Sequence, residues 1–309
     1  MSVKNVRTLA VAVGTAALLF AVGACGKEGT PTGGGDGAKA ASDACSSSGV
    51  KLTAAKDASV PGSATFNKIK KSGTVTVGVK ADQPNLGYKD TSGKRCGFDI
   101  EIAQLVAAQL GVDPKKIQYK EIPSENRETA LQGGEVDYYV GTYSITDERK
   151  QQVGFAGPYF IAGQDFLVRK DDTSITGPKS IKGKKVCSAT GSTPIQYVRD
   201  HHLTDQVVEF KTYSECVSQL IDSKVDAVTT DDAILKGYAA QNPSQLKVVG
   251  KPFTTEKYGI GVPKADKALR NKINDIIVAS EKDGTWQKIY DGTLGKSGSK
   301  ATPPKIERY

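Results

Sequence analysis

The sequence predicts an α/β fold made of two similar halves, each a mostly parallel sheet flanked by helices. From Thr74 onward, short apolar strands alternate with amphipathic helices, and the cycle repeats after the middle of the 309-residue chain. In addition, each half contains a helix, a polar turn, a Val-Asp pair and a strand, centred on Asp137 and on Asp226. Val-Asp pairs also occur in ordinary turns. The repeated pattern therefore supports the fold only together with the alternation of strands and helices.

The first half is predicted to hold three strands and two main helices. Val75, Val77 and Val79 alternate with other residues as in a half-buried strand. Asp99 precedes apolar residues at helical spacing, so we predict it as the N-cap of the first helix. The predicted strands are 74–79, 117–122 and 136–140, and the predicted helices are 99–110 and 125–131.

The second half repeats this pattern and is joined to the first by two crossings. Segment 154–170 is expected to carry the chain to the second half and segment 250–262 to carry it back. Two crossings of this kind form a hinge. A helix over 267–283 is expected to pack on the first half. The predicted strands of the second half are 185–188, 207–210 and 227–229, and its predicted helices are 193–201, 214–222 and 232–240.

The amino-terminal segment is predicted to be a secretion signal rather than part of the folded protein. Lys4 and Arg7 precede an uncharged, mostly apolar run that ends at Cys25, which is typical of a secretory signal. The run is shorter than the roughly 20 residues of a membrane span. Because Val22-Gly23-Ala24-Cys25 resembles a bacterial lipobox, we predict cleavage before a lipid-modified Cys25. An ordinary signal peptide is the alternative.

A flexible segment is expected after the signal. Residues 26–44 contain no large apolar side chain, so burial cannot offset the entropy lost on ordering them. The predicted organisation is a signal peptide over 1–24, a lipid-anchored tether over 25–59, lobe 1 over 60–162 and 256–295, lobe 2 over 163–255, and a loose tail over 296–309.

Composition excludes several classes of function. The formal charge is +8, from 42 basic and 34 acidic residues, but the lysines are scattered rather than clustered, which argues against a nucleic-acid partner. The chain has two His, which excludes a His-rich metal site. It has no phosphate-binding loop, no Gly-x-Ser-x-Gly elbow and no dinucleotide fingerprint. We therefore expect no metal and no cofactor.

Four cysteines follow Cys25, and in an oxidising compartment they allow three pairings. We favour Cys187 with Cys216 and Cys45 with Cys96, because each pair then lies within one predicted half. A metal site built from all four is the alternative, which the lack of a Cys-x-x-Cys pair disfavours.

Polar residues occupy the predicted carboxyl ends of a strand in each half. Thr142 and Asp231 each lie five residues after the Asp of the repeated Val-Asp pair. Open α/β sheets bind ligands at the carboxyl ends of their strands. Two such ends that face each other predict a ligand cleft between the halves.

Several motifs carry a resemblance to a known family. They are Cys96-Gly97-Phe98-Asp99, Ser144-Ile145-Thr146-Asp147-Glu148-Arg149, Gly191-Ser192-Thr193 and Asp231-Asp232-Ala233. Over about 60–294, and in its leader, the chain resembles the extracellular solute-binding proteins of polar amino acid ABC transporters. Through Lys80 and Ser124-Glu125-Asn126-Arg127 it is most similar to the glutamate- and aspartate-binding members.

The resemblance implies a type II, two-lobed fold like that of periplasmic binding proteins. It implies a monomer without enzymatic activity that delivers an amino acid to an ABC permease with its cytoplasmic ATPase. It also implies an extracytoplasmic location, anchored to the cell membrane by lipid on the outer surface of a Gram-positive cell.

The resemblance further implies roles for individual residues. Arg149 and the 191–193 loop are expected to hold the ligand α-carboxylate, the Arg because its fork can bind a carboxylate bidentately. Asp231 is expected to hold the ammonium with help from Thr142 and Ser144. Thr146 and Asp231 also suit helix N-caps, which is the structural alternative. The predicted ligand-binding set is Lys80, Ser124, Arg127, Thr142, Ser144, Arg149, Ser192, Thr193, Thr230 and Asp231.

Lys80 and Arg127 together imply a ligand with a second carboxylate. With Arg149 they outnumber the single carboxylate of Asp231, and a neutral amide would leave desolvated cations poorly paired. We therefore expect L-glutamate, with aspartate as a close analogue. The alternatives are glutamine or asparagine, a dehydratase-type enzyme on the same fold, and the ligand-sensing domain of a receptor.

Overall fold

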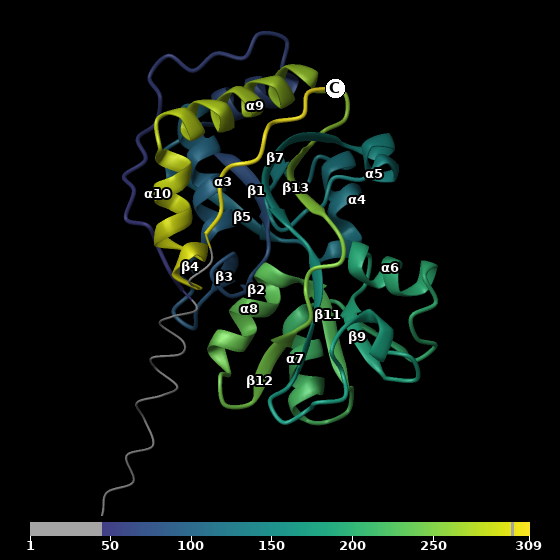
Figure 1. Ribbon diagram of the computed structural model, residues 1–309. Coiled ribbons are helices and arrows are strands. Elements are labelled where there is room, and N and C mark those ends of the chain that lie inside the picture. Colours follow the sequence, from purple (N-terminus) through teal and green to yellow (C-terminus); the bar gives the residue numbers. More distant parts are fainter. Residues whose placement is uncertain (1–44, 298–299) are drawn as a thin grey trace, which may run out of the picture. The chain divides into compact units, whose positions relative to one another are not determined.

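The computed structural model describes residues 45–297 and 300–309. The predicted signal peptide, Cys25 and the tether up to residue 44 lie outside the described residues. The described part contains two five-stranded sheets and a small three-stranded sheet, with helices around them (Figure 1). Within it, no helix has the length and apolar character needed to cross a bilayer.

The first five-stranded sheet has the strand order β5-β1-β6-β13-β7. β1 is parallel to β5 and to β6, whereas β13 is antiparallel to β6 and β7. The alternation that predicted β1 is confirmed, because Val75, Val77 and Val79 are all buried. β6 is shorter than the predicted strand 136–140, since it pairs with β1 at only two positions. The strands are β1 (Val75–Val79), β5 (Ile117–Glu121), β6 (Tyr138–Tyr139), β7 (Gly154–Ala162) and β13 (Glu256–Val262).

The second five-stranded sheet has the order β10-β9-β11-β8-β12. β9 is parallel to β10 and β11, and β8 is antiparallel to β11 and β12. β11 continues two residues beyond its predicted end, so Asp231 lies at its carboxyl end. The strands are β8 (Gln164–Arg169), β9 (Val186–Ala189), β10 (Val207–Phe210), β11 (Ala227–Asp231) and β12 (Leu246–Val249).

The chain passes between the two sheets twice, as predicted. β7 in the first sheet leads to β8 in the second, and β12 in the second leads back to β13 in the first. In each sheet four strands therefore run in the same direction, and the single strand that runs against them is β13 in the first sheet and β8 in the second. The crossings run close together at Gly163, where an added Cβ would lie 2.6 Å from the carbonyl oxygen of Thr254.

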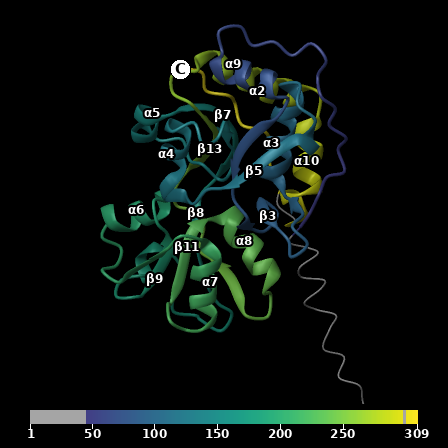
Figure 2. The same cartoon turned by 180° about the vertical axis from the view of Figure 1, so that it is seen from behind.

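Each sheet is covered by its own helices (Figure 2). α9 packs on β7 and α3, and α10 packs on α3 and α9. α6 and α7 contact β9 and β11, while α8 contacts β8, β11 and β12. The helices are α2 (Ala64–Ser72), α3 (Phe98–Gln109), α4 (Arg127–Gln132), α5 (Asp147–Gln152), α6 (Thr193–Asp200), α7 (Tyr213–Ile221), α8 (Asp232–Gln241), α9 (Lys267–Lys282) and α10 (Thr285–Gly292). Short 3₁₀ helices are η1 (Pro114–Lys116), η2 (Ser124–Asn126), η3 (Pro178–Ser180) and η4 (Leu294–Ser297).

The predicted N-cap of α3 is wrong. Gly97 occupies the N-cap, and Asp99 lies in the first turn, fully buried. Gly97 has φ 109°, and an added Cβ would lie 2.3 Å from the carbonyl oxygen of Leu86, so only glycine fits. The Asp99 carboxylate instead accepts hydrogen bonds from the Thr142 N–H at 2.9 Å and the Tyr159 hydroxyl at 2.8 Å. Burial raises the pKa of Asp99 to about 6, against the effect of these two bonds.

Both favoured disulfides are present. Cys187 on β9 is bonded to Cys216 on α7, and Cys45 is bonded to Cys96. Cys96 belongs to the small antiparallel sheet, which lies ahead of α3 in the chain. That sheet has the order β2-β3-β4, with β2 (Asp82–Gln83), β3 (Gly87–Lys89) and β4 (Arg95–Cys96).

Residues 45–59, which the sequence assigns to the flexible tether, make specific contacts with α3. The hydroxyl of Ser47 and the N–H of Ser48 each donate to the Glu101 carboxylate at 2.8 Å. The N–H of Ala55 donates to the carbonyl of Ala108 at 2.8 Å. The tether prediction therefore does not hold for this stretch.

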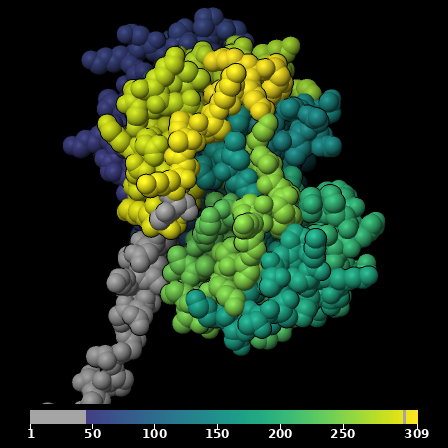
Figure 3. All heavy atoms as spheres, in the orientation of Figure 1, coloured from purple at the N-terminus to yellow at the C-terminus, as the bar shows by residue number. Residues whose placement is uncertain are grey.

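The carboxyl-terminal segment is bound rather than loose. It lies on the surface of the molecule beside α9 (Figure 3). The N–H of Phe155 donates to the Tyr309 hydroxyl at 2.7 Å, and the N–H of Glu307 donates to the Gly157 carbonyl at 2.9 Å. The Arg270 guanidinium lies 4.5 Å from the centre of the Tyr309 ring. The segment therefore fastens to β7, the strand that leads into the first crossing.

Candidate functional site

Lys80, Ser124 and Arg127 form a buried cluster beside the end of β1. Lys80 follows the last residue of β1, and its Nζ donates to the Ser124 hydroxyl at 2.8 Å. Ser124 opens η2, and its carbonyl accepts the Nε–H of Arg127 at 2.9 Å. These three residues of the predicted ligand-binding set are thus adjacent.

Burial strongly lowers the pKa of the Lys80 ammonium. Only 6% of the residue is exposed. Burial, and after it the charge of Arg127, lower the pKa of Lys80 to about 7, although Asp82 acts in the opposite direction. The ammonium is therefore poised between its charged and neutral forms near neutral pH.

Arg127 and Arg149 lie together over one aromatic ring. Their guanidinium carbons are 4.3 Å and 5.2 Å from the centre of the Tyr143 ring. One Nη of each also donates to the carbonyl of Gly191, at 3.2 Å from Arg127 and 3.0 Å from Arg149. Two cations from helices α4 and α5 thereby converge on a loop that leaves the second sheet.

Arg149 is held from three sides. Its Nη1 donates to the carbonyl of Ser144 at 2.8 Å, and its Nε lies 3.2 Å from a carboxylate oxygen of Glu128. Burial and the neighbouring Arg127 lower its pKa to about 10. Thr146 is the N-cap of α5 and accepts from the Arg149 N–H. The capping role of Thr146 and the inward position of Arg149 therefore coexist.

The 191–193 loop closes over these arginines. Gly191 has φ 72°, and an added Cβ would lie 2.6 Å from the Cα of Glu125, so glycine is required there. Ser192 caps α6 by accepting from the Ile195 N–H. The Thr193 hydroxyl donates to the Glu256 carboxylate at 2.8 Å and lies 3.3 Å from the hydroxyl of Ser144.

Asp231 is a buried carboxylate with one oxygen unpartnered in the described structure. It occupies the N-cap position of α8, but its side chain makes no capping bond. Its Oδ2 accepts from the Tyr258 hydroxyl at 2.6 Å, and its buried Oδ1 has no partner among residues 45–297 and 300–309. Burial, and after it the charge of Glu256, raise the pKa of Asp231 to about 8. Thr230, the residue before Asp231 on β11, is also fully buried.

Thr142 is fixed by a buried network. Its backbone adopts φ 45°, a conformation that is uncommon outside glycine. The N–H bonds to Asp99, the hydroxyl donates to Gln83 at 3.1 Å, and the carbonyl accepts from Arg127 at 3.3 Å. Asp99, which sequence reasoning placed at a helix cap, thus orients a predicted site residue.

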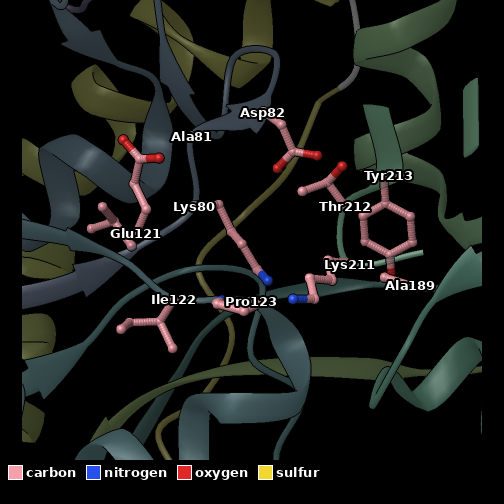
Figure 4. Close-up of a pocket in the computed structure, with 11 residues that line it drawn as sticks. Lys80, Ala81, Asp82, Glu121, Ile122, Pro123, Ala189, Lys211, Thr212 and Tyr213 are labelled. Atoms are coloured by element: carbon pink, nitrogen blue, oxygen red, sulfur yellow. The ribbon is translucent and has the colours of Figure 1, made fainter. Parts of the chain in front are cut away.

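A cavity of about 330 Å³ opens beside Lys80 between the two sheets (Figure 4). Tyr213, Lys211 and Thr212 line it from the second sheet's side, and Asp82 lines it from the small sheet. Sequence reasoning missed these four residues. The capping box formed by Thr212 and Glu215 marked this helix start in the sequence, but nothing local indicated that it faces Lys80.

The acidic residues of the site change its charge balance. Sequence reasoning counted three cations against Asp231 alone. The structure adds Glu128, which pairs with Arg149, and the buried Glu256, which accepts from Thr193. The positive excess inferred from the sequence is therefore offset within the site.

The arrangement offers groups of both charges to a zwitterionic ligand. Convergent arginines and the start of α6 offer a place for a carboxylate, and the free oxygen of Asp231 offers a place for an ammonium.

Comparisons with known proteins match most of the chain to one family. A family model described as "Bacterial extracellular solute-binding proteins, family 3" matches residues 75–296. The chain is 40% identical over 267 residues to a glutamate-binding protein of Corynebacterium efficiens, covering 83% of this chain and 90% of that one. It is also 40% identical over 248 residues to a glutamine-binding protein of Bacillus subtilis, covering 80% and 89%.

A solved structure with the same fold is that of an ancestral arginine-binding protein bound to glutamine. It is 41% identical to this chain, with a TM-score of 0.68, and the match covers 72% of this chain and 98% of that one. The two-lobed α/β fold predicted from the sequence is thereby confirmed. The chain belongs to the family 3 bacterial extracellular solute-binding proteins.

Proposed function

We propose that the protein binds L-glutamate, with aspartate as a weaker analogue, and delivers it to an ABC importer. The observation that carries the proposal is the buried cluster of Lys80, Ser124 and Arg127 beside the 330 Å³ cavity. A ligand side chain that enters this cavity meets the Lys80 ammonium, which is only 6% exposed. A carboxylate there would restore the charged form of Lys80, whose pKa burial has lowered.

Recognition of the amino acid backbone is assigned to a different set of groups. Arg149 and the N–H groups of the 191–193 loop take the α-carboxylate, which would replace the Gly191 carbonyl as a partner of Arg149. The free oxygen of Asp231 takes the ammonium. These groups are shared by every amino acid, so they provide affinity without selecting a side chain.

Glutamine is the second candidate, and three observations favour it. Glu128 and Glu256 offset the arginines of the site. Lys80, with a pKa of about 7, can also present a neutral amine that accepts a hydrogen bond from an amide. The relative of Bacillus subtilis, which is as similar in sequence as the glutamate-binding one, is a glutamine-binding protein.

Calorimetric titration with glutamate, aspartate, glutamine and asparagine tests the choice. The wild type is expected to bind glutamate most tightly. Lys80→Met removes the buried ammonium and keeps a chain of similar length, so glutamate affinity should fall by about 30-fold or more, because truncating one partner of a desolvated charge pair costs 2–5 kcal/mol. Glutamine affinity should change much less.

A matched control is Lys70→Met, which removes an exposed lysine from α2. It should leave every affinity unchanged. A wild type that prefers glutamine, or a Lys80→Met variant with the wild-type ratio of glutamate to glutamine affinity, would contradict the proposal.

Attachment to the membrane is part of the proposal and rests on Val22-Gly23-Ala24-Cys25. Lipidation of Cys25 would hold the monomeric protein outside the cell near its permease. Cys25→Ala should release the protein into the medium and leave amino acid binding intact. If cell fractionation finds this variant still in the membrane, the lipid anchor is excluded.

A further inference from the structure

Asp82 makes three hydrogen bonds to helices of the second sheet. Its Oδ2 accepts from the N–H of Ser214 at 3.1 Å and from the hydroxyl of Tyr238 at 3.1 Å. The same Tyr238 hydroxyl lies 2.6 Å from the Asp82 backbone carbonyl. Asp82 belongs to β2, whereas Ser214 lies on α7 and Tyr238 on α8.

These bonds connect two parts of the fold that the chain joins only through its crossings. The loop after β2 is tied to α3, because the Asn85 carbonyl accepts from the Phe98 N–H at 2.8 Å. α7 and α8 pack on β9, β11 and β12 of the second sheet. The contact is close: a Cβ added to Gly237 of α8 would lie 2.8 Å from the Pro84 carbonyl oxygen. Movement of the second sheet away from α3 would break it.

The electrostatics favour this contact. Ser214 is the second residue of α7, so its N–H has no acceptor within the helix. A carboxylate at a helix amino terminus is favoured by the helix dipole as well as by the hydrogen bond. Tyr238 is only 4% exposed, so opening would also expose its ring to water.

We propose that Asp82 is a positioning residue that sets the affinity for every ligand by holding the two sheets together around the site. Its carboxylate is engaged by Ser214 and Tyr238, so its principal role is to stabilise the ligand-enclosing arrangement, although it also lines the cavity beside Lys80. The apparent affinity of any ligand scales with the population of the binding-competent state. Loss of Asp82 should therefore weaken all ligands by one common factor. This inference rests on the solute-binding role and is independent of the choice of glutamate.

The test compares dissociation constants and dissociation rates for several amino acids. Asp82→Ala should raise the dissociation constant of glutamate and of glutamine by the same factor, about 10-fold to 100-fold, because hydrogen bonds to a charged group are lost. The change should arise mainly from faster dissociation. Tyr238→Phe keeps the ring but removes the contacts of its hydroxyl with both the carboxylate and the backbone carbonyl of Asp82, so it should also weaken all ligands by one common factor. It also tests the contact if Asp82→Ala fails to fold.

Asp90→Ala is the matched control. Asp90 follows β3 in the same small sheet, and among the described residues its carboxylate accepts only from Ser92 and Lys94 of its own turn. This variant should keep wild-type affinities and dissociation rates. In the double variant of Asp82→Ala and Tyr238→Phe, the loss should be smaller than the sum of the two single losses, since each substitution removes the bond between the Tyr238 hydroxyl and the Asp82 carboxylate.

Three results would overturn the inference. They are dissociation constants for Asp82→Ala and Tyr238→Phe within twofold of wild type, a loss confined to one amino acid, or an equal loss in Asp90→Ala. A wild type that prefers glutamine would contradict the proposed ligand, but the common factor at Asp82 would still be expected.

Discussion

The two sides of the site differ in what they supply. The side of the first sheet supplies long cationic side chains, and Arg127 and Arg149 are both held against Tyr143 by several hydrogen bonds. The side of the second sheet supplies a backbone loop and the carboxylate of Asp231, one oxygen of which has no partner in the described structure. The arginines of the first side are thus held in place by hydrogen bonds, whereas the second side has a carboxylate oxygen that can still accept a hydrogen bond.

The same comparison appears in the electrostatics. Burial lowers the pKa of Lys80 to about 7 on the first side and raises that of Asp231 to about 8 on the second. Both shifts favour the neutral form, although the residues have opposite charges. A charged ligand would reverse both shifts, so proton uptake and release on binding can separate the contributions of the two sides.

The largest expected effect comes from removing Arg149, the first-side residue proposed to bind the α-carboxylate that all amino acids share. Arg149→Ala should weaken glutamate, aspartate, glutamine and asparagine alike, by about 2–5 kcal/mol, because a desolvated charge loses its partner. Calorimetry measures the loss. Arg308→Ala, which removes an exposed arginine paired with Asp275, is the control. Retention of tight binding by Arg149→Ala would remove this residue from the site.

Removing the Cys187–Cys216 disulfide on the second-sheet side should lower the stability of the fold and leave the ligand selectivity unchanged. Replacing Cys187 and Cys216 by Ser opens the link between β9 and α7, whose ends are 29 residues apart in the sequence. The expected loss of unfolding free energy is about 3–4 kcal/mol in the chain-entropy model. Thermal or denaturant unfolding measures it. The ratio of glutamate to glutamine affinity should stay the same, and a changed ratio would show that this bond shapes the pocket.

The smallest expected effect is a change with pH in the ratio of glutamate to glutamine affinity, which separates the role of Lys80 from that of Asp231. Asp231 must be ionised to hold any ammonium, so its titration affects all ligands equally and cancels in a ratio. Lys80 must be charged to hold a distal carboxylate, so glutamate should lose affinity relative to glutamine as pH rises above about 7. The limit is about tenfold per pH unit. Titrations from pH 6 to pH 9 measure it, and Lys80→Met should abolish the dependence.

Most of the fold could be predicted because its signals are local. Strand β10 and helix α6 follow from apolar periodicity and from caps such as Ser192. The N-cap of α3 could not be predicted, because Asp99 has the right chemistry for a cap. It is drawn instead into contact with Thr142 and Tyr159, which lie far away in the sequence.

The candidate site was predicted where a motif marks it and missed where only packing defines it. Arg149, the 191–193 loop and Asp231 belong to recognisable motifs. Tyr143 beneath the arginines and Glu256 beside Thr193 belong to none. Their positions depend on how the crossing strands pair, which no short stretch of sequence encodes.

The Cys45–Cys96 bond has a mechanical consequence. It closes residues 45–96 into a covalent loop, so tension applied to the chain before Cys45 passes directly into β4, two residues ahead of α3. Residues 46–59 would carry little of that tension, so the tension would not detach them from α3 one after another. A protein held at its amino-terminal end would thus be pulled at the first-sheet side, while the second sheet stays free of tension.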